Sequence, residues 1–93
     1  MIRSFASAET ERFFRTGRSK RMPTEIRERA AMRLRQLDAA TAVGDLRFPP
    51  SNQLEALLGK RSGGYSIRIN DQWRICFTFE GGHAYEVEIV DYH

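Results

Sequence analysis

The second half of the chain changes its hydrophobic pattern from helical spacing to strict alternation. Apolar residues fill every second position in three stretches, Tyr65–Ile69, Trp73–Phe79 and Tyr85–Ile89. Strict alternation is typical of half-buried β-strands. Asn70-Asp71 and Gly81-Gly82 separate the stretches, and both dipeptides favour tight turns. The sequence therefore predicts three consecutive strands that pair as an antiparallel meander.

Two helical patterns precede these strands. Ser7 is a predicted N-cap and Gly17 a predicted stop for a first helix. Pro23 and Thr24 open a second helix that should end near Ala42. Its apolar stripe repeats at intervals of four, four and three residues, at Ile26, Ala30, Leu34 and Leu37. The polar and charged residues between them, Arg33 included, are expected on the solvated faces of this helix.

The predicted order of elements is β-α-α-β-β-β within one domain, residues 1–93. We expect an α+β fold with two N-terminal helices packed on one face of a small, mainly antiparallel sheet of three to four strands. The short segment Ile2–Phe5 could supply the fourth strand, whereas residues 45–58 are expected to be irregular around Pro49-Pro50. The helices should cover one face of the sheet, formed by Trp73, Ile75, Phe77, Val87 and Ile89.

Composition excludes several classes of protein. No apolar run reaches the roughly 20 residues that a membrane-spanning helix needs, and the first residues do not resemble a signal peptide. The single cysteine, Cys76, cannot form an internal disulfide. No Cys/His spacing suggests a metal site, and no motif suggests a cofactor. We therefore expect a cytoplasmic protein that works without metal or cofactor.

Charge is distributed unevenly along the chain. Residues 1–22 carry six Lys/Arg against two Glu, and residues 77–93 carry four acids without Lys or Arg. The basic part is a candidate surface for a polyanion such as RNA. A solvated, Arg-rich helical surface is the alternative interpretation.

The polar face of the predicted sheet carries the candidate chemistry. Arg68 and Arg74 share their parity with Ser66, Asn70, Cys76 and Thr78, so both arginines should project from an open face and could hold a phosphate. Exposed strands also carry Arg simply to stay soluble. The chain ends with a carboxylate, a phenol and an imidazole, in Asp91, Tyr92 and His93. Alternation places Tyr92 on the arginine face, and Asp91 and His93 on the other.

The order of elements, the stretch from Tyr65 to Phe77 and the closing Asp91-Tyr92-His93 resemble the HigB-type toxins of the RelE superfamily. The resemblance covers almost the whole chain, and its specific part is residues 65–93. It implies a type II toxin–antitoxin toxin that cuts translated mRNA in the ribosomal A site. In that reaction the ribose 2′-OH attacks the adjacent phosphate without a metal.

The resemblance also implies roles for individual residues. Arg74 matches the arginine that contacts the scissile phosphate, Tyr92 and His93 match the terminal pair, and Asp91 supports them. In a gapless alignment with the family, the position of a second arginine can coincide with Asn70, and Arg68 lies two residues earlier on the same face. The position of a family lysine can coincide with Leu58, and Lys60 is then the nearest replacement. The expected RNA-binding residues are therefore Lys60, Arg61 and Asn70, together with Lys20 and Arg21 of the basic loop.

The expected partners follow from the same resemblance. They are a HigA-like helix-turn-helix antitoxin, the ribosome with its mRNA, and operator DNA reached only through the antitoxin complex. The alternative function is a non-catalytic module that binds nucleic acid or antitoxin. Cleavage of RNA separates the two hypotheses, because the second predicts salt-sensitive binding with intact RNA.

Overall fold

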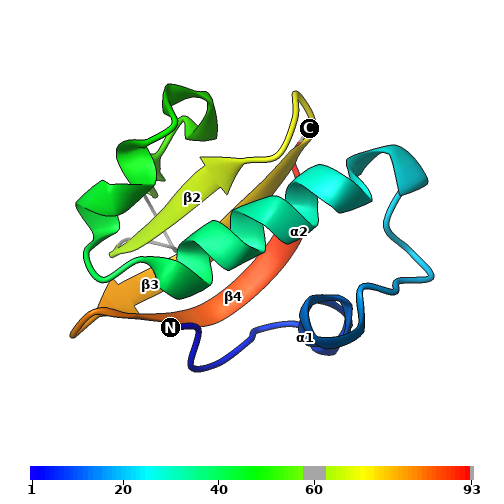
Figure 1. The fold of residues 1–93 in the computed structure, drawn as a ribbon, viewed down its shortest axis with the longest axis horizontal. Helices are drawn as coiled ribbons and strands as arrows, with labels where there is room; N and C mark the ends of the chain where they lie inside the picture. Colours follow the sequence, from blue (N-terminus) through cyan, green and yellow to red (C-terminus); the bar gives the residue numbers. More distant parts are fainter. Residues whose placement is uncertain (58–62, 93) are drawn as a thin grey trace.

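Two helices pack on a four-stranded antiparallel sheet, which confirms the predicted α+β fold. The computed structural model describes residues 1–57 and 63–92. The elements are α1 (Ala8–Thr16), α2 (Thr24–Ala39), the 3₁₀ turns η1 (Val43–Arg47) and η2 (Pro50–Asn52), and strands β1 (Glu55–Ala56), β2 (Gly64–Arg68), β3 (Trp73–Glu80) and β4 (His83–Asp91). The strand order is β1-β2-β3-β4. Helix α2 crosses one face of the sheet, and the end of β4 lies beside the β2–β3 turn (Figure 1).

Local signals set the bounds of both helices. The Ser7 Oγ accepts a hydrogen bond from the Thr10 N–H (3.2 Å), and Gly17 ends α1 in the left-handed conformation (φ 73°), as predicted. Helix α2 ends at Ala39, three residues before the predicted end. The Asp45 carboxylate accepts hydrogen bonds from the N–H groups of Thr41 (3.1 Å) and Ala42 (3.2 Å), which draws the chain out of the helix.

The core lies between α2 and the sheet. The apolar stripe of α2 is buried as predicted, and Ile75, Phe77 and Val87 of the sheet are at most 2% exposed. Each fully buried side chain of this kind stabilises the fold by about 1.5–3 kcal/mol. Trp73 and Ile89, which the alternation also predicts in the core, are only half-buried at its margin. The core is therefore closed in the middle of the sheet, and Trp73 and Ile89 pack against its edge.

The fourth strand does not come from the N-terminus. It is β1, which lies within the segment predicted to be irregular and pairs with β2. Ile2 and Phe5 instead form isolated parallel bridges with Ala84 and Val87 of β4. The N-terminal segment thus follows the outer edge of β4 without forming a regular strand.

A β-bulge changes the alternation within β4. The register shifts between Cys76 and Thr78, and Glu86 takes a positive φ of 52°. Tyr85 consequently lies across from Thr78 on the polar face, although its spacing predicts the same face as Val87 and Ile89. A bulge inserts one residue and reverses the faces beyond it, and periodicity alone does not reveal it.

The predicted open face is partly covered, which corrects the sequence-based expectation. Ser66, Arg74 and Cys76 are 0%, 8% and 2% exposed. Gln53 and Glu55, from η2 onward into β1, contact the Arg74 side chain, which in turn lies on Ser66. Arg33 is also buried, although its place on α2 predicts a solvated position.

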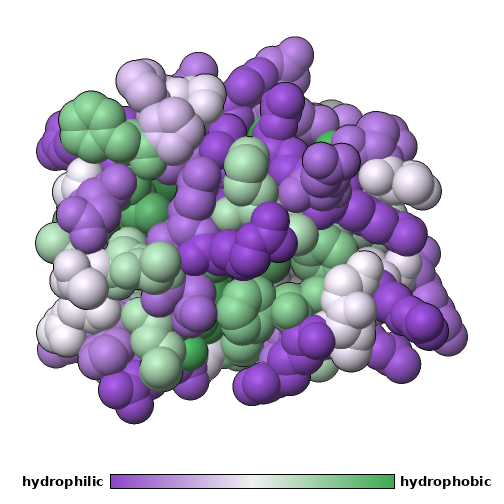
Figure 2. Space-filling model, viewed as in Figure 1, coloured by the Kyte–Doolittle hydropathy of each residue, from purple (hydrophilic) through white to green (hydrophobic). Residues whose placement is uncertain are grey.

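The face covered by α2 is mainly hydrophilic at its surface, and its apolar surface is divided into separate patches (Figure 2). Within the described ranges, no helix combines the length and apolar character needed to cross a membrane.

Candidate active site

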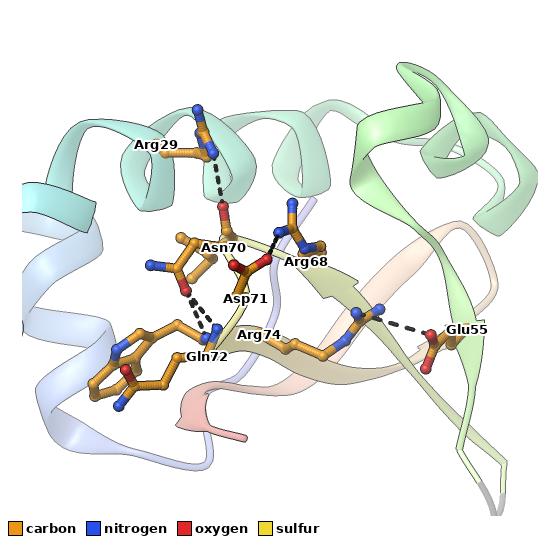
Figure 3. Close-up of polar contacts among 9 residues, drawn as sticks. Arg29, Glu55, Arg68, Asn70, Asp71, Gln72 and Arg74 are labelled. Carbon is orange, nitrogen blue, oxygen red and sulfur yellow. Dashed lines mark hydrogen bonds and ion pairs between the residues drawn. The ribbon is translucent and has the colours of Figure 1, made fainter. Parts of the chain in front are cut away.

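The β2–β3 hairpin places the two candidate arginines directly across from each other. Arg68 is the last residue of β2, and its Cα partner on β3 is Arg74. Residues paired in this way project from the same face of an antiparallel sheet. The turn between them is fixed by Asn70, whose Oδ1 accepts hydrogen bonds from the backbone N–H groups of Gln72 (2.9 Å) and Trp73 (2.8 Å) (Figure 3). The relative position of the arginines is therefore set by strand register and a side-chain-capped turn.

Arg74 is held by its surroundings along most of its length. Its Nε donates a hydrogen bond to the Ser66 Oγ (2.8 Å), and its Nη2 donates to the Gln53 carbonyl oxygen (2.5 Å). Its Nη1 lies 3.9 Å from a carboxylate oxygen of Glu55, whose side chain is 59% exposed (Figure 3). The guanidinium thus has a fixed orientation, with its outer edge beside an exposed carboxylate. A fixed cation of this kind can stabilise charge that develops on a phosphate.

Arg68 is held less firmly. Its Nη2 forms an ion pair with Asp71, whose side chain is 97% exposed, while the Arg68 side chain is 25% exposed. An exposed ion pair contributes little free energy, because water solvates both partners well. A phosphate can therefore replace the Asp71 carboxylate on Arg68 at small cost.

The end of β4 lies beside the same turn. Asp91 pairs with Trp73 in the register and accepts a hydrogen bond from the Gln72 Nε2 (3.0 Å). The next residue, Tyr92, donates its N–H to the Gln72 carbonyl oxygen (2.5 Å) and is 43% exposed. Because Val90 pairs with Arg74, alternation leaves Tyr92 on the arginine face and Asp91 on the Trp73 face. The structure thus brings Arg68, Arg74, Asp91 and Tyr92 to one end of the sheet. His93 lies outside the described residues.

The expected RNA-binding residues are not all near this end. Asn70 lines a groove of about 540 Å³ between α2 and the hairpin, with Arg29 and Arg35 among its walls. Arg21 lines a smaller hollow with Trp73, whereas Lys20 lines a separate one on α1. Lys60 and Arg61 lie outside the described residues.

The second histidine is far from the arginines. His83 begins β4 at the end opposite Tyr92, and its ring Nε2 lies 3.2 Å from Arg3 Nη2. Burial and the charges of Arg3 and the N-terminal ammonium lower the pKa of His83. Within residues 1–57 and 63–92, no group of three or more His, Cys, Asp or Glu side chains is placed to hold a metal ion.

Sequence comparison assigns the family. Residues 3–93 match the family model described as RelE-like toxin of type II toxin-antitoxin system HigB. The chain belongs to this toxin family. It is 36% identical over 93 residues to "Endoribonuclease HigB" of Proteus vulgaris, with complete coverage of both chains. It is 38% identical over 85 residues to "Toxin HigB-1" of Vibrio cholerae, with 90% of each chain covered. The resemblance to HigB-type toxins is thereby confirmed.

Solved structures support the same fold at much lower identity. The YoeB–YefM complex from Staphylococcus aureus matches with a TM-score of 0.63 at 17% identity, over 100% of this chain and 98% of that one. A variant of YafQ from E. coli matches with a TM-score of 0.63 at 8% identity, over 98% and 93% of the two chains. A type II toxin has a protein antitoxin as its partner, and membership of this family gives the chain such a partner.

Arg33 is the residue of this region that sequence reasoning missed. It is buried on α2 and donates its Nε to the carbonyl oxygen of Arg68 (3.0 Å). The sequence signal for its burial is the neighbouring Leu34 of the apolar stripe. Two adjacent residues of a helix can both be buried where the apolar face is wide.

Proposed function

We propose that this chain is an endoribonuclease toxin that cuts translated mRNA on the ribosome by metal-independent attack of a ribose 2′-OH. The family and the full-length relative named as an endoribonuclease support the toxin and nuclease class. The observation that carries the proposed mechanism is the pair Arg68 and Arg74, held across from each other beside Asp91 and Tyr92. The whole chain, residues 1–93, acts as one toxin domain in this proposal.

The reaction is an internal transfer within the RNA. A base removes the proton of the 2′-OH, the 2′ oxygen bonds to the adjacent phosphorus, and the bond from phosphorus to the 5′ oxygen breaks. An acid then protonates the leaving 5′ oxygen. Arg74, with its guanidinium fixed, and Arg68, once released from Asp71, stabilise the crowded phosphorane by charge-assisted hydrogen bonds.

Proton transfer is assigned to the end of β4. Tyr92 lies on the arginine face and is exposed enough to meet a phosphate, and His93 follows it in sequence. Asp91 is engaged by Gln72 on the other face, which suits a supporting role. Either Tyr92 or His93 can serve as the acid while the other serves as the base. The basic side chains of Lys20, Arg21, Lys60 and Arg61, together with the neutral amide of Asn70, are the candidates that would contact the mRNA or the ribosome.

The proposed partners complete this function. A HigA-like helix-turn-helix antitoxin neutralises the toxin, and operator DNA is bound only through that complex. The toxin acts in the cytoplasm, where translating ribosomes are found. Co-expression of the antitoxin should restore growth to cells that the toxin arrests.

The chemistry of the cut ends tests this function. Purified chain is added to ribosomes that translate a defined mRNA, and the products are mapped by primer extension. Attack by the 2′-OH predicts a 2′,3′-cyclic phosphate and a 5′-hydroxyl at the cut, and no cleavage where that nucleotide lacks its 2′-OH. A 5′-phosphate and a 3′-hydroxyl at the cut would contradict the mechanism. Intact mRNA would instead support the non-catalytic binding module.

A further inference from the structure

Helix α2 carries a positively charged residue, Arg33, at a buried position, where apolar side chains are usual. Arg33 is only 3% exposed, between the helix and the hairpin. Burial lowers its pKa, and the nearby charges of Arg29 and Arg68 lower the pKa further. Removing a guanidinium from water costs several kcal/mol unless its partners compensate.

The partners of Arg33 compensate only in part. Its Nε donates to the Arg68 carbonyl oxygen (3.0 Å), and its Nη2 donates to the Ser51 Oγ (3.3 Å). Both acceptors are neutral, and within the described part of the chain Arg33 forms no ion pair. Hydrophobic side chains often replace even a buried ion pair without loss of stability, and Arg33 lacks the favourable charge interaction of such a pair. The stability of the fold therefore does not explain why a buried arginine occupies this position.

Both hydrogen bonds lead to the candidate phosphate site. The first holds the backbone of Arg68 where β2 ends. The second holds Ser51 in η2, and two residues later the Gln53 carbonyl oxygen accepts the hydrogen bond from Arg74 Nη2 (2.5 Å). One buried guanidinium thus links α2 to the strand that carries Arg68 and to the turn that orients Arg74.

Arg29 adds to this connection from one helical turn earlier. Its Nη1 donates to the carbonyl oxygen of Ile69 (3.3 Å), the residue next to Arg68 (Figure 3). Residues four apart lie on the same side of a helix, so Arg29 and Arg33 contact consecutive carbonyl groups of the hairpin. Arg29 is exposed, whereas Arg33 is enclosed and fixed.

We propose that Arg33 is a positioning residue for RNA cleavage, which acts by holding the backbone of Arg68 and the η2 turn that orients the Arg74 guanidinium. This inference rests on the proposed nuclease function. Arg33 does not contact the phosphate; it fixes the two groups that do. Displacement of a catalytic group by about 1 Å can lower a rate by about 100-fold, so a small shift of the hairpin is sufficient for a large effect.

Three variants test this role. Arg33→Met removes both hydrogen bonds and keeps an apolar stem, Arg33→Lys keeps the charge, and Arg35→Met removes one charge from an exposed position on the same helix. We expect kcat/KM for ribosome-bound mRNA to fall by about 10- to 100-fold in Arg33→Met, mainly through kcat. Arg33→Lys should be intermediate, and Arg35→Met should stay close to the wild-type chain. Thermal melting curves give the folded fraction of each variant at the assay temperature, and every rate is normalised to that fraction.

Testing Arg33→Met in a chain that already carries Arg74→Gln separates a positioning role from simple destabilisation. In Arg74→Gln one of the two groups to be positioned is already lost, so Arg33→Met should cost less there than in the wild-type chain. An equal factor in both backgrounds, or normalised rates equal to wild type, would overturn the proposal. The Nε–H resonance of Arg74 gives a readout without RNA: Arg33→Met should shift it and speed its hydrogen exchange, and Arg35→Met should not. Absence of cleavage by the wild-type chain would count against the proposed function, whereas an unchanged Arg74 resonance would count against Arg33 alone.

Discussion

The hairpin end of the sheet and the connection between α1 and α2 both carry arginines, but they hold different parts of the chain in place. In the hairpin, the guanidinium group of Arg74 is fixed by hydrogen bonds to Ser66 and Gln53. In the connection, residues 17–23, the backbone is fixed instead. Glu9 accepts a hydrogen bond from the Ser19 Oγ (2.6 Å), and Arg27 donates to the Ser19 carbonyl oxygen (2.7 Å).

The cations of the connection are left at the surface. Arg18, Lys20 and Arg21 are all exposed. An exposed, flexible cation attracts any nearby phosphate, whereas a fixed cation can favour one geometry of one phosphate. Anchorage of the charged group, more than charge itself, therefore distinguishes a candidate catalytic residue from one that only attracts RNA.

The largest expected effect is at Arg74. Arg74→Gln removes a fixed, charged donor and should lower kcat/KM by about 100-fold. Arg68→Gln removes the less firmly held partner and should lower it by about 10-fold. Rates of mRNA cleavage on purified ribosomes measure both effects. Equal losses of kcat/KM in the two variants would contradict the distinction between a fixed and a weakly held arginine.

A smaller effect is expected in the connection. Lys20→Gln should lower cleavage only a few-fold, and it should reduce the salt dependence of binding by about 0.7 in log–log slope for each lost phosphate contact. The measurement is the apparent affinity for ribosomes across a series of salt concentrations, with Glu11→Gln on neighbouring α1 as a charge-change control. A loss as large as that of Arg74→Gln would place Lys20 in the catalytic machinery.

The smallest effect concerns stability and pH. The hydrogen bond from Ser19 lowers the pKa of Glu9 below its ordinary value of 4.5, although some desolvation opposes this shift. A lowered carboxyl pKa contributes stability above the unfolded value, and this contribution is lost as pH falls through the folded value. Wild type should therefore melt slightly higher than Glu9→Gln at pH 6, and the two should converge as pH falls below the folded-state pKa of Glu9. A difference that persists at low pH would mean that the Glu9 charge does not secure the connection.

Sequence patterns predicted the elements that depend on local signals. The caps at Ser7 and Gly17 and the apolar stripe of α2 are properties of neighbouring residues, and the structure confirms them. The alternation also predicted that Arg68 and Arg74 share a face of the sheet, and their pairing across β2 and β3 agrees with this. Long-range contacts were not predictable in the same way. The coverage of Arg74 by Gln53, the burial of Arg33 and the bulge at Glu86 all depend on how distant segments meet.

The N-terminal segment and α1 have a consequence for the solubility of the free toxin. An unpaired strand edge can add a strand of another molecule and so start aggregation. Along the outer edge of β4, several backbone N–H groups already have acceptors in the N-terminal segment and α1. Those of Ala84 and Val87 donate to the carbonyl oxygens of Met1 and Ser4. Those of Glu86 and Ile89 donate to the hydroxyl oxygens of Ser4 and Thr10. At the other edge β1 is only two residues long. As far as residues 1–57 and 63–92 show, a toxin released from its antitoxin therefore offers little free edge for self-association.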